Sequence, residues 1–138
     1  MIEQHVSFEL DDDFDRLDHE VIWAYLSQEA KWGRWRSRET VEAQLRNAWC
    51  VAGAYLESGQ QVAFARAISD GYGVAYLADV FVLTTHQRLG IGSRLVVFVL
   101  NHGPSFRWML HTYDAHDFYR QLGFREAEAT YLERRPSN

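Results

Sequence analysis

An apolar run that ends at two closely spaced glycines is the feature that most constrains how this chain can fold. Residues 76–83 form the run, Gln87-Arg-Leu-Gly-Ile-Gly92 follows, and a second apolar segment begins directly afterwards. Glycine weakens a helix because it loses backbone entropy and packs no side chain. We therefore expect a strand that enters a helix through a junction where bare backbone is needed.

Such a junction presents free backbone N–H groups at the positive end of a helix dipole, which is a site for an anion. The side chains of Arg88 and Arg94 add positive charge around it. A P-loop would need a lysine after the second glycine, and a dinucleotide fingerprint would need a glycine where Leu95 stands. The acyl-CoA loop pattern, [Q/R]xxGx[G/A], is satisfied by residues 87–92. The alternative is that both glycines serve only tight packing of helix on strand.

Hydrophobic periodicity predicts the remaining elements. The first half contains a strand at 5–10, an amphipathic helix at 14–30 that follows Asp11–Asp13 and ends at Gly33, a helix capped by Ser37 or Thr40 and ending near Asn47, and strands at 49–56 and 61–68. The second half contains a strand at 74–83, a helix at 89–102, a strand at 106–111, a helix from its cap Asp114 to Leu122, and a last strand at 124–134. The order is β-α-α-β-β-β-α-β-α-β, and residues 1–138 are expected to form one domain.

Charge and composition narrow the function classes. The 138 residues carry a net charge of −5, which argues against a nucleic-acid binder, because such proteins present a basic surface. No apolar run approaches the roughly 20 residues that a membrane span needs, and the first residues lack a signal-peptide pattern. A single cysteine, Cys50, leaves no intrachain disulfide. The expected location is therefore the cytoplasm.

A second motif lies downstream of the glycine junction. In Ala115-His-Asp-Phe-Tyr-Arg-Gln-Leu-Gly-Phe124, the residues Ala115, Tyr119, Gly123 and Phe124 follow the pattern AxxLYxxxGF, with Phe118 in place of leucine. Together the two motifs and the order of elements resemble the GCN5-related N-acetyltransferase (GNAT) superfamily. The resemblance implies an α+β fold with a mixed, mostly antiparallel central sheet, helices on both faces, and splayed fourth and fifth strands.

The resemblance also implies where acetyl-CoA binds. Pantetheine would lie along the fourth strand and pyrophosphate on the loop, so the implied contacts are Val80, Phe81, Val82, Gln87, Arg88, Leu89, Gly90, Ile91, Gly92 and Ser93. Thr112 stands where the family often has asparagine. Tyr119 matches the tyrosine that donates a proton to the leaving thiolate, although a tyrosine that only packs the helix on the sheet is the alternative.

The residues that bind and deprotonate the acceptor are less constrained by sequence. Asp79 interrupts an apolar strand, so partial burial would raise its pKa toward that of a useful base; alternatively it binds a substrate cation or anchors a loop. His111 is the second candidate for the base. Trp32, Arg34 and Trp35 are expected to contact the acceptor, unless the tryptophans fold onto the core. The six histidines show no metal-binding spacing, so we expect no metal.

These features predict an acetyl-CoA-dependent N-acetyltransferase that transfers the acetyl group directly to a primary amine of a small molecule or peptide. Cys50 lies away from both motifs, so no acyl-enzyme is expected. The alternatives are a non-catalytic acyl-CoA sensor or partner-binding module, and an enzyme that acetylates protein lysines. The apolar last strand is also a candidate interface for a homodimer.

Overall fold

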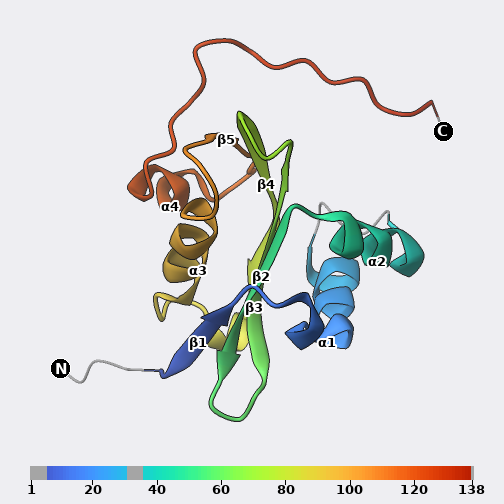
Figure 1. Ribbon diagram of the computed structural model, residues 1–138, viewed down its shortest axis with the longest axis vertical. Helices are drawn as coiled ribbons and strands as arrows, with labels where there is room; N and C mark the ends of the chain where they lie inside the picture. The colour runs from blue at the N-terminus through green and yellow to red at the C-terminus, as the bar shows by residue number, and fades with distance from the viewer. Residues whose placement is uncertain (1–5, 31–35, 138) are drawn as a thin grey trace.

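One mixed sheet organises the computed structural model, which describes residues 6–30 and 36–137 (Figure 1). The described strands are β1 (Phe8–Asp11), β2 (Cys50–Leu56), β3 (Gln61–Ser69), β4 (Val74–Val82) and β5 (Arg107–Met109), in the spatial order β1-β2-β3-β4-β5. The first three pairings are antiparallel and β4 pairs with β5 in parallel. The predicted mixed, mostly antiparallel sheet is confirmed.

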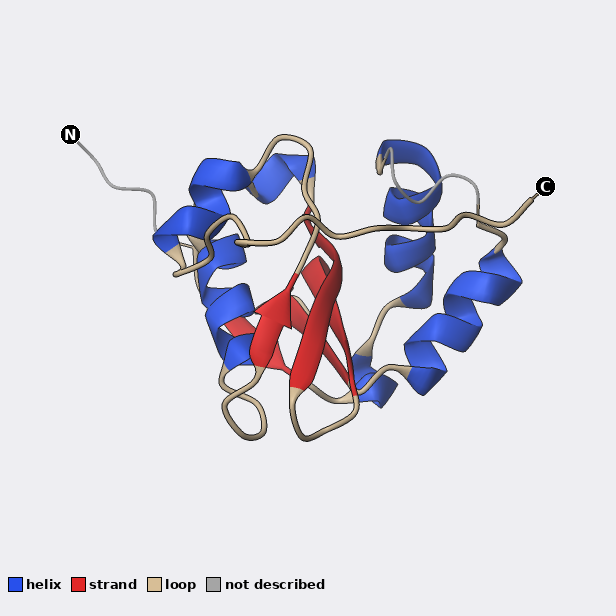
Figure 2. Cartoon of the chain, turned by 90° about the horizontal axis from the view of Figure 1, so that it is seen from above, coloured by secondary structure: helices blue, strands red, loops and turns tan. Residues whose placement is uncertain are grey.

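Helices cover both faces of this sheet, as predicted (Figure 2). One face carries α3 (Ile91–Leu100) and α4 (His116–Gln121); the other carries α1 (His19–Ala24), a π-helical turn η2 (Tyr25–Glu29) and α2 (Arg38–Asn47). Short 3₁₀ turns, η1 (Phe14–Arg16) and η3 (Thr84–His86), precede α1 and α3. Two separate cores result. The first lies under α3 and contains the alanines of β2 and β3, and the second lies under α1 and α2 around Phe64 and Phe81.

The predicted continuous helix over 14–30 is wrong. The described part is η1, then α1, then η2, because the side chain of Asp18 accepts hydrogen bonds from the N–H groups of Glu20 and Val21 and begins a new helix. An apolar periodicity does not reveal such an internal cap, since aspartate also fits the polar face of a helix. Ser37, rather than Thr40, caps α2.

Strands β4 and β5 separate soon after they begin. Cα pairing joins only Val74 to Arg107, Ala75 to Trp108 and Tyr76 to Met109, while β4 continues to Val82. Within residues 6–30 and 36–137, the part of β4 beyond Tyr76 therefore has no partner strand on that side. The predicted splay between the fourth and fifth strands is confirmed, and it opens a V-shaped gap toward the glycine loop.

A β-bulge changes the phase of β4 within this gap. Phe64 pairs with Phe81 and Arg66 with Ala78, so that Ala65 alone faces both Asp79 and Val80. Asp79 adopts a φ of 55°, which is uncommon for a residue other than glycine. Leu77 consequently belongs to the core under α3, whereas Phe81, an even number of residues later, belongs to the core under α1 and α2.

The predicted last strand over 124–134 is wrong. Residues 124–137 form no strand, their side chains are largely exposed, and the segment runs across the upper end of the sheet in Figure 1. The physical reason is that β5 offers an edge of only three residues, and glutamates and arginines occupy both sides of the alternating tail. Alternation predicts a strand only where one side of it can be buried.

Candidate active site

The loop between β4 and α3 exposes the start of a helix. Gly90 is the N-cap residue of α3, with φ 81° and ψ 1°, and no side chain of the described residues caps the helix. The N–H groups of the first turn have no partner within a helix, so they remain available to a ligand at the positive end of the dipole. Arg88, whose φ is 65°, is exposed beside them.

The two glycines of the loop serve different purposes. A Cβ on Gly90 would contact no atom of the described residues within 4 Å, so the positive φ is what requires glycine there. At Gly92, a Cβ would lie 3.3 Å from Cγ2 of Val82 and 3.5 Å from Cζ of Phe118. Gly92 therefore allows α3 to approach β4 and α4 closely, which agrees with the packing alternative at that position alone.

The other predicted cofactor residues of the loop and β4 divide by the direction of their side chains. Nε2 of Gln87 donates to the carbonyl oxygen of Val82 over 3.0 Å and ties the loop to β4. Ile91 is buried in the core, so it can offer only its backbone. Three of the residues pack around the core under α3, namely Val80, Val82 and Leu89, and Ser93 is half-buried. Phe81 faces the opposite side of the sheet, where its ring stacks on that of Tyr25 with the centroids 4.1 Å apart.

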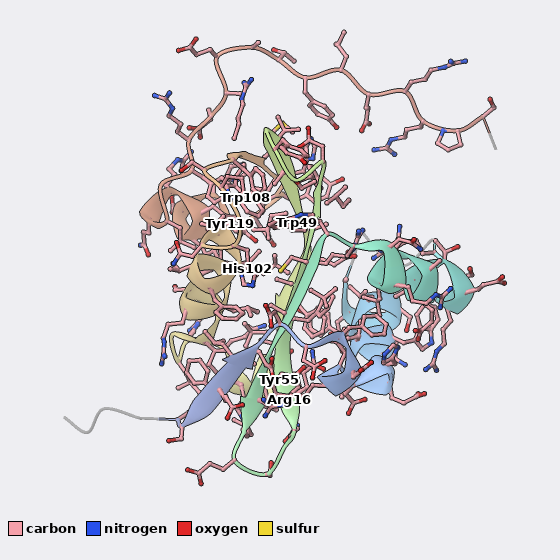
Figure 3. The ribbon with its side chains drawn as sticks, viewed as in Figure 1. Arg16, Trp49, Tyr55, His102, Trp108 and Tyr119 are labelled. Carbon is pink, nitrogen blue, oxygen red and sulfur yellow. The ribbon has the colours of Figure 1, made fainter. Side chains whose placement is uncertain are left out.

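Tyr119 lies on α4, on the same side of the sheet as α3. In the view of Figure 3 the labels of Tyr119 and of Trp108, on β5, stand in the upper part of the picture, and both side chains pack against the core under α3. Burial raises the pKa of Tyr119 to about 12. Its hydroxyl has no hydrogen-bond partner within the described chain and keeps access to solvent. Thr112 supports this helix, because its Oγ1 accepts from the N–H of Ala115 over 3.0 Å.

Asp79 is a buried counter-ion. Arg36 donates from Nη1 and Nη2 to its two carboxylate oxygens, both over 2.9 Å, and Nε of Arg66 donates over 2.6 Å. Burial acts to raise the pKa of Asp79, but the hydrogen bond from Arg36 and the charges of both arginines outweigh it and hold the pKa below its usual value. The expected rise is therefore wrong. The arrangement agrees instead with the anchoring alternative, since Arg36 begins the segment that leads into α2.

His111 and Tyr76 meet where β4 and β5 separate. The hydroxyl of Tyr76 is hydrogen-bonded to Nδ1 of His111, and the ring of Tyr131 from the tail lies 4.3 Å from the imidazole, centroid to centroid. Tyr76 sits two residues after the start of β4 and was not identified from the sequence, nor were Arg36 and Arg66. A lone aspartate in an apolar strand was the one signal that a buried cation had to exist.

Other predictions fall outside this group. Trp32, Arg34 and Trp35 lie outside the described residues. Cys50 is buried and its pKa is raised to about 11 by desolvation, so its thiol stays protonated at neutral pH. Over residues 6–30 and 36–137, no cluster of three or more histidine, cysteine or acidic side chains could hold a metal ion, and no helix is long and apolar enough to cross a membrane.

Known proteins share this architecture. Residues 46–126 match the model of the acetyltransferase (GNAT) domain. A crystal structure from Xanthomonas campestris pv. campestris, described as a "putative acetyltransferase belonging to the gnat family", is 31% identical with a TM-score of 0.83, covering 94% of this chain and 96% of that one. A GNAT family protein of Streptococcus pneumoniae is 22% identical with a TM-score of 0.78, covering 96% of this chain and 100% of that one, and shares the fold.

A curated relative from Gibberella zeae, named "Putative acetyltransferase FG08082", is 28% identical over 80% of this chain. The match spans 63% of that relative's length. The family model covers more than half of the chain, and the likeness to the Xanthomonas structure extends over nearly all of it. The chain belongs to the GNAT acetyltransferase family.

Proposed function

We propose that the protein is an acetyl-CoA-dependent N-acetyltransferase acting on a primary amine. The observation that carries this proposal is the uncapped start of α3, with Gly90 at φ 81°, next to the gap between β4 and β5. Free N–H groups suit a pyrophosphate, and unpaired β4 backbone suits the amide groups of pantetheine. Membership of the GNAT family supports the same reading.

The backbone of residues 87–93 would hold the pyrophosphate, with Arg88 adding positive charge. Val80, Phe81 and Val82 would bond pantetheine through their backbone in the open part of β4. Thr112 already accepts a hydrogen bond from Ala115, so its hydroxyl proton is the part left for a cofactor contact. Acetyl-CoA supplies an activated thioester.

Tyr119 would act as the general acid. When the amine nitrogen bonds to the acetyl carbon and the C–S bond breaks, the hydroxyl of Tyr119 gives its proton to the sulfur. A pKa of about 12 keeps this proton in place at neutral pH. Its hydroxyl is free of protein partners within the described residues, as a proton donor to a ligand requires.

His111, with Tyr76, is the better-placed base. Asp79 already accepts from two arginines, so it has little basicity left for an ammonium group. His111 is exposed at the mouth of the gap. Its Nδ1 is hydrogen-bonded to the hydroxyl of Tyr76, so the other ring nitrogen, Nε2, is the one that would accept a proton. A neutral imidazole there would accept the proton that the amine loses.

The first test is titration calorimetry of acetyl-CoA into wild type and Gly90→Glu. We expect micromolar binding that weakens at least about tenfold in the variant, because a carboxylate would occupy the anion site. Gly59→Glu is the matched control: Gly59 also has a positive φ (91°) and open space around it, but it lies in the β2–β3 turn. Folded wild type that binds no acetyl-CoA would refute the proposal.

A screen of amines for thiol release follows if acetyl-CoA binds. Release with a small amine or a peptide supports the enzyme. Tight binding without release from any small amine, peptide or protein lysine would instead favour an acyl-CoA sensor. The two results separate catalysis from binding, since each is measured on the same folded protein.

A further inference from the structure

We propose that the acceptor amine also carries an anionic group, a carboxylate or a phosphate, and that this group binds the open edge of the Arg66 guanidinium. The inference rests on the proposed function and names the substrate class of the same site. It comes from a charge imbalance around Asp79. Among the described residues, this group holds two arginines and one carboxylate.

All three side chains are almost fully buried. The side chains of Arg36 and Asp79 are each 4% exposed and that of Arg66 is 9% exposed. Both oxygens of Asp79 accept from Arg36, which matches one carboxylate to one guanidinium in bidentate geometry. The second guanidinium has only a share of the same carboxylate. A buried charge without a full partner is costly, so this excess positive charge favours an anion.

The donors of Arg66 show where the anion would bind. Its Nε donates to Asp79, and within the described chain no residue accepts from its two Nη nitrogens, which keep access to solvent. These two nitrogens present parallel N–H groups that match the two oxygens of a carboxylate or phosphate. In contrast, Nε of Arg36 is buried and has no acceptor among the residues that the structure describes. Of the two arginines around Asp79, Arg66 is therefore the one whose guanidinium a ligand can reach.

The position of Arg66 fits an acceptor rather than the cofactor. Its neighbours Ala65 and Ala67 belong to the core under α3, so Arg66 projects to the opposite face of the sheet. Tyr76 lies on that face too, and the charges of Asp79 and Arg66 both act on the pKa of its hydroxyl, which places the arginine near the Tyr76–His111 pair. The glycine loop and Tyr119 lie on the α3 side. An amine that approaches from the opposite side would pass Arg66.

The experiment compares matched amines in the thiol-release assay: glycine with glycinamide, β-alanine with its amide, and 2-aminoethyl phosphate with ethanolamine. We expect at least one anionic member to have a kcat/KM about 10- to 100-fold above its neutral partner. The carboxylate and phosphate pairs identify which anion is preferred. Equal kcat/KM values within every pair would overturn the inference and leave the acetyltransferase proposal intact.

Variants assign the preference to the guanidinium. Arg66→Gln should abolish the preference while the Kd of acetyl-CoA stays unchanged. Arg66→Lys keeps a cation beside Asp79 and should still lose most of it, because lysine lacks the paired donors; it is the decisive variant where Arg66→Gln does not fold. Arg107→Gln removes an exposed arginine from β5 and should keep the preference. A preference that survives Arg66→Lys, or that falls equally in Arg107→Gln, would contradict the assignment.

A binding assay covers the case in which no amine is acetylated. N-acetylglycine and N-acetylglycinamide are titrated into wild type saturated with CoA, and we expect the acid to bind at least about tenfold more tightly. No preference for the acid overturns the inference. Failure of CoA itself to bind refutes the proposed function, so the two failures are distinguishable.

Discussion

Arg36 donates two hydrogen bonds of 2.9 Å to the two carboxylate oxygens of Asp79, and so joins the start of α2 to the bulge in β4. The bulge holds Asp79 at a φ of 55°, a conformation that costs energy for a residue with a side chain. The ion pair holds the carboxylate in place despite that cost. Asp79 therefore positions the strand next to the proposed site rather than acting as a base in it.

Replacing Asp79 should destabilise the fold strongly. Asp79→Asn leaves two buried guanidiniums without their carboxylate, and removing one partner of a buried ion pair typically costs about 3–5 kcal/mol of unfolding free energy. Denaturant titration measures the loss. Asp117→Asn is the control, because Asp117 is exposed on α4 and its solvent-screened pairing with Arg120 should contribute little to stability. An Asp79→Asn loss as small as that of the control would contradict the buried pairing.

The carboxylate of Asp79 also makes the free energy of unfolding depend on pH. Because the pKa of Asp79 in the folded chain lies below its ordinary value of 3.8, its contribution to stability is fully present above that value and is lost as the pH falls through the folded pKa. The stability difference between wild type and Asp79→Asn should therefore be constant from pH 7 to about pH 5 and shrink only below about pH 4. Unfolding free energies across this range test the prediction. A difference that shrinks already between pH 7 and pH 5 would indicate a raised pKa.

Tyr119→Phe should lower kcat about 10²- to 10⁴-fold without changing the Kd of acetyl-CoA, because the ring still packs and only the proton donor is lost. Since the pKa of Tyr119 is about 12, its deprotonation should not limit activity up to pH 10. Tyr72→Phe, at an exposed turn, is the control. Wild-type kcat in Tyr119→Phe would show that this tyrosine only packs.

His111→Gln should lower kcat by at least about tenfold, since the amine loses its proton acceptor. Tyr76→Phe should have a smaller effect, because it removes only the hydrogen bond that orients the imidazole. His19→Gln is the control, since His19 pairs with Glu42 on the outer helices. Steady-state kinetics at saturating acetyl-CoA measure all three. A kcat in His111→Gln equal to that of the control would exclude His111 as the base.

Removing residues 126–138 should change the unfolding midpoint by less than about 2 °C, because the described part of this tail is exposed and makes few contacts. Light scattering should give the same number of chains per particle before and after truncation. A fall in that number would show instead that the tail holds two copies together, as the homodimer expectation from the sequence requires.

Much of the fold could be predicted from local patterns. The apolar periods gave β2, β3, β4, α2, α3 and α4 to within the one or two residues by which element ends are ordinarily assigned differently. The pairing of β4 with β5 followed only from the family resemblance. The break at Asp18 was missed because one aspartate serves equally as a cap or as a polar-face residue.

The partners of Asp79 could not be predicted, because they depend on register. Arg66 reaches Asp79 only because the bulge moves that residue opposite Ala65, and a bulge leaves no mark in the alternation of an apolar strand. Arg36 reaches it from the other side through the packing of α2. Burial of the carboxylate was therefore foreseeable, whereas the sign of its pKa shift was not.

The bulge in β4 exchanges the sides of the sheet that odd-numbered and even-numbered residues of the strand face. Residues before Asp79 point to one side of the sheet at odd positions, and residues after it point there at even positions. Deleting Asp79 would remove the extra residue and let the strand alternate without a break, with Phe81 still facing α1 and α2 and Val80 and Val82 still facing α3. Straightening the strand without removing a residue would instead turn Phe81 toward α3 and both valines away from it. The extra residue is therefore what allows β4 to carry the arginine-bound carboxylate while each core keeps its own side chains.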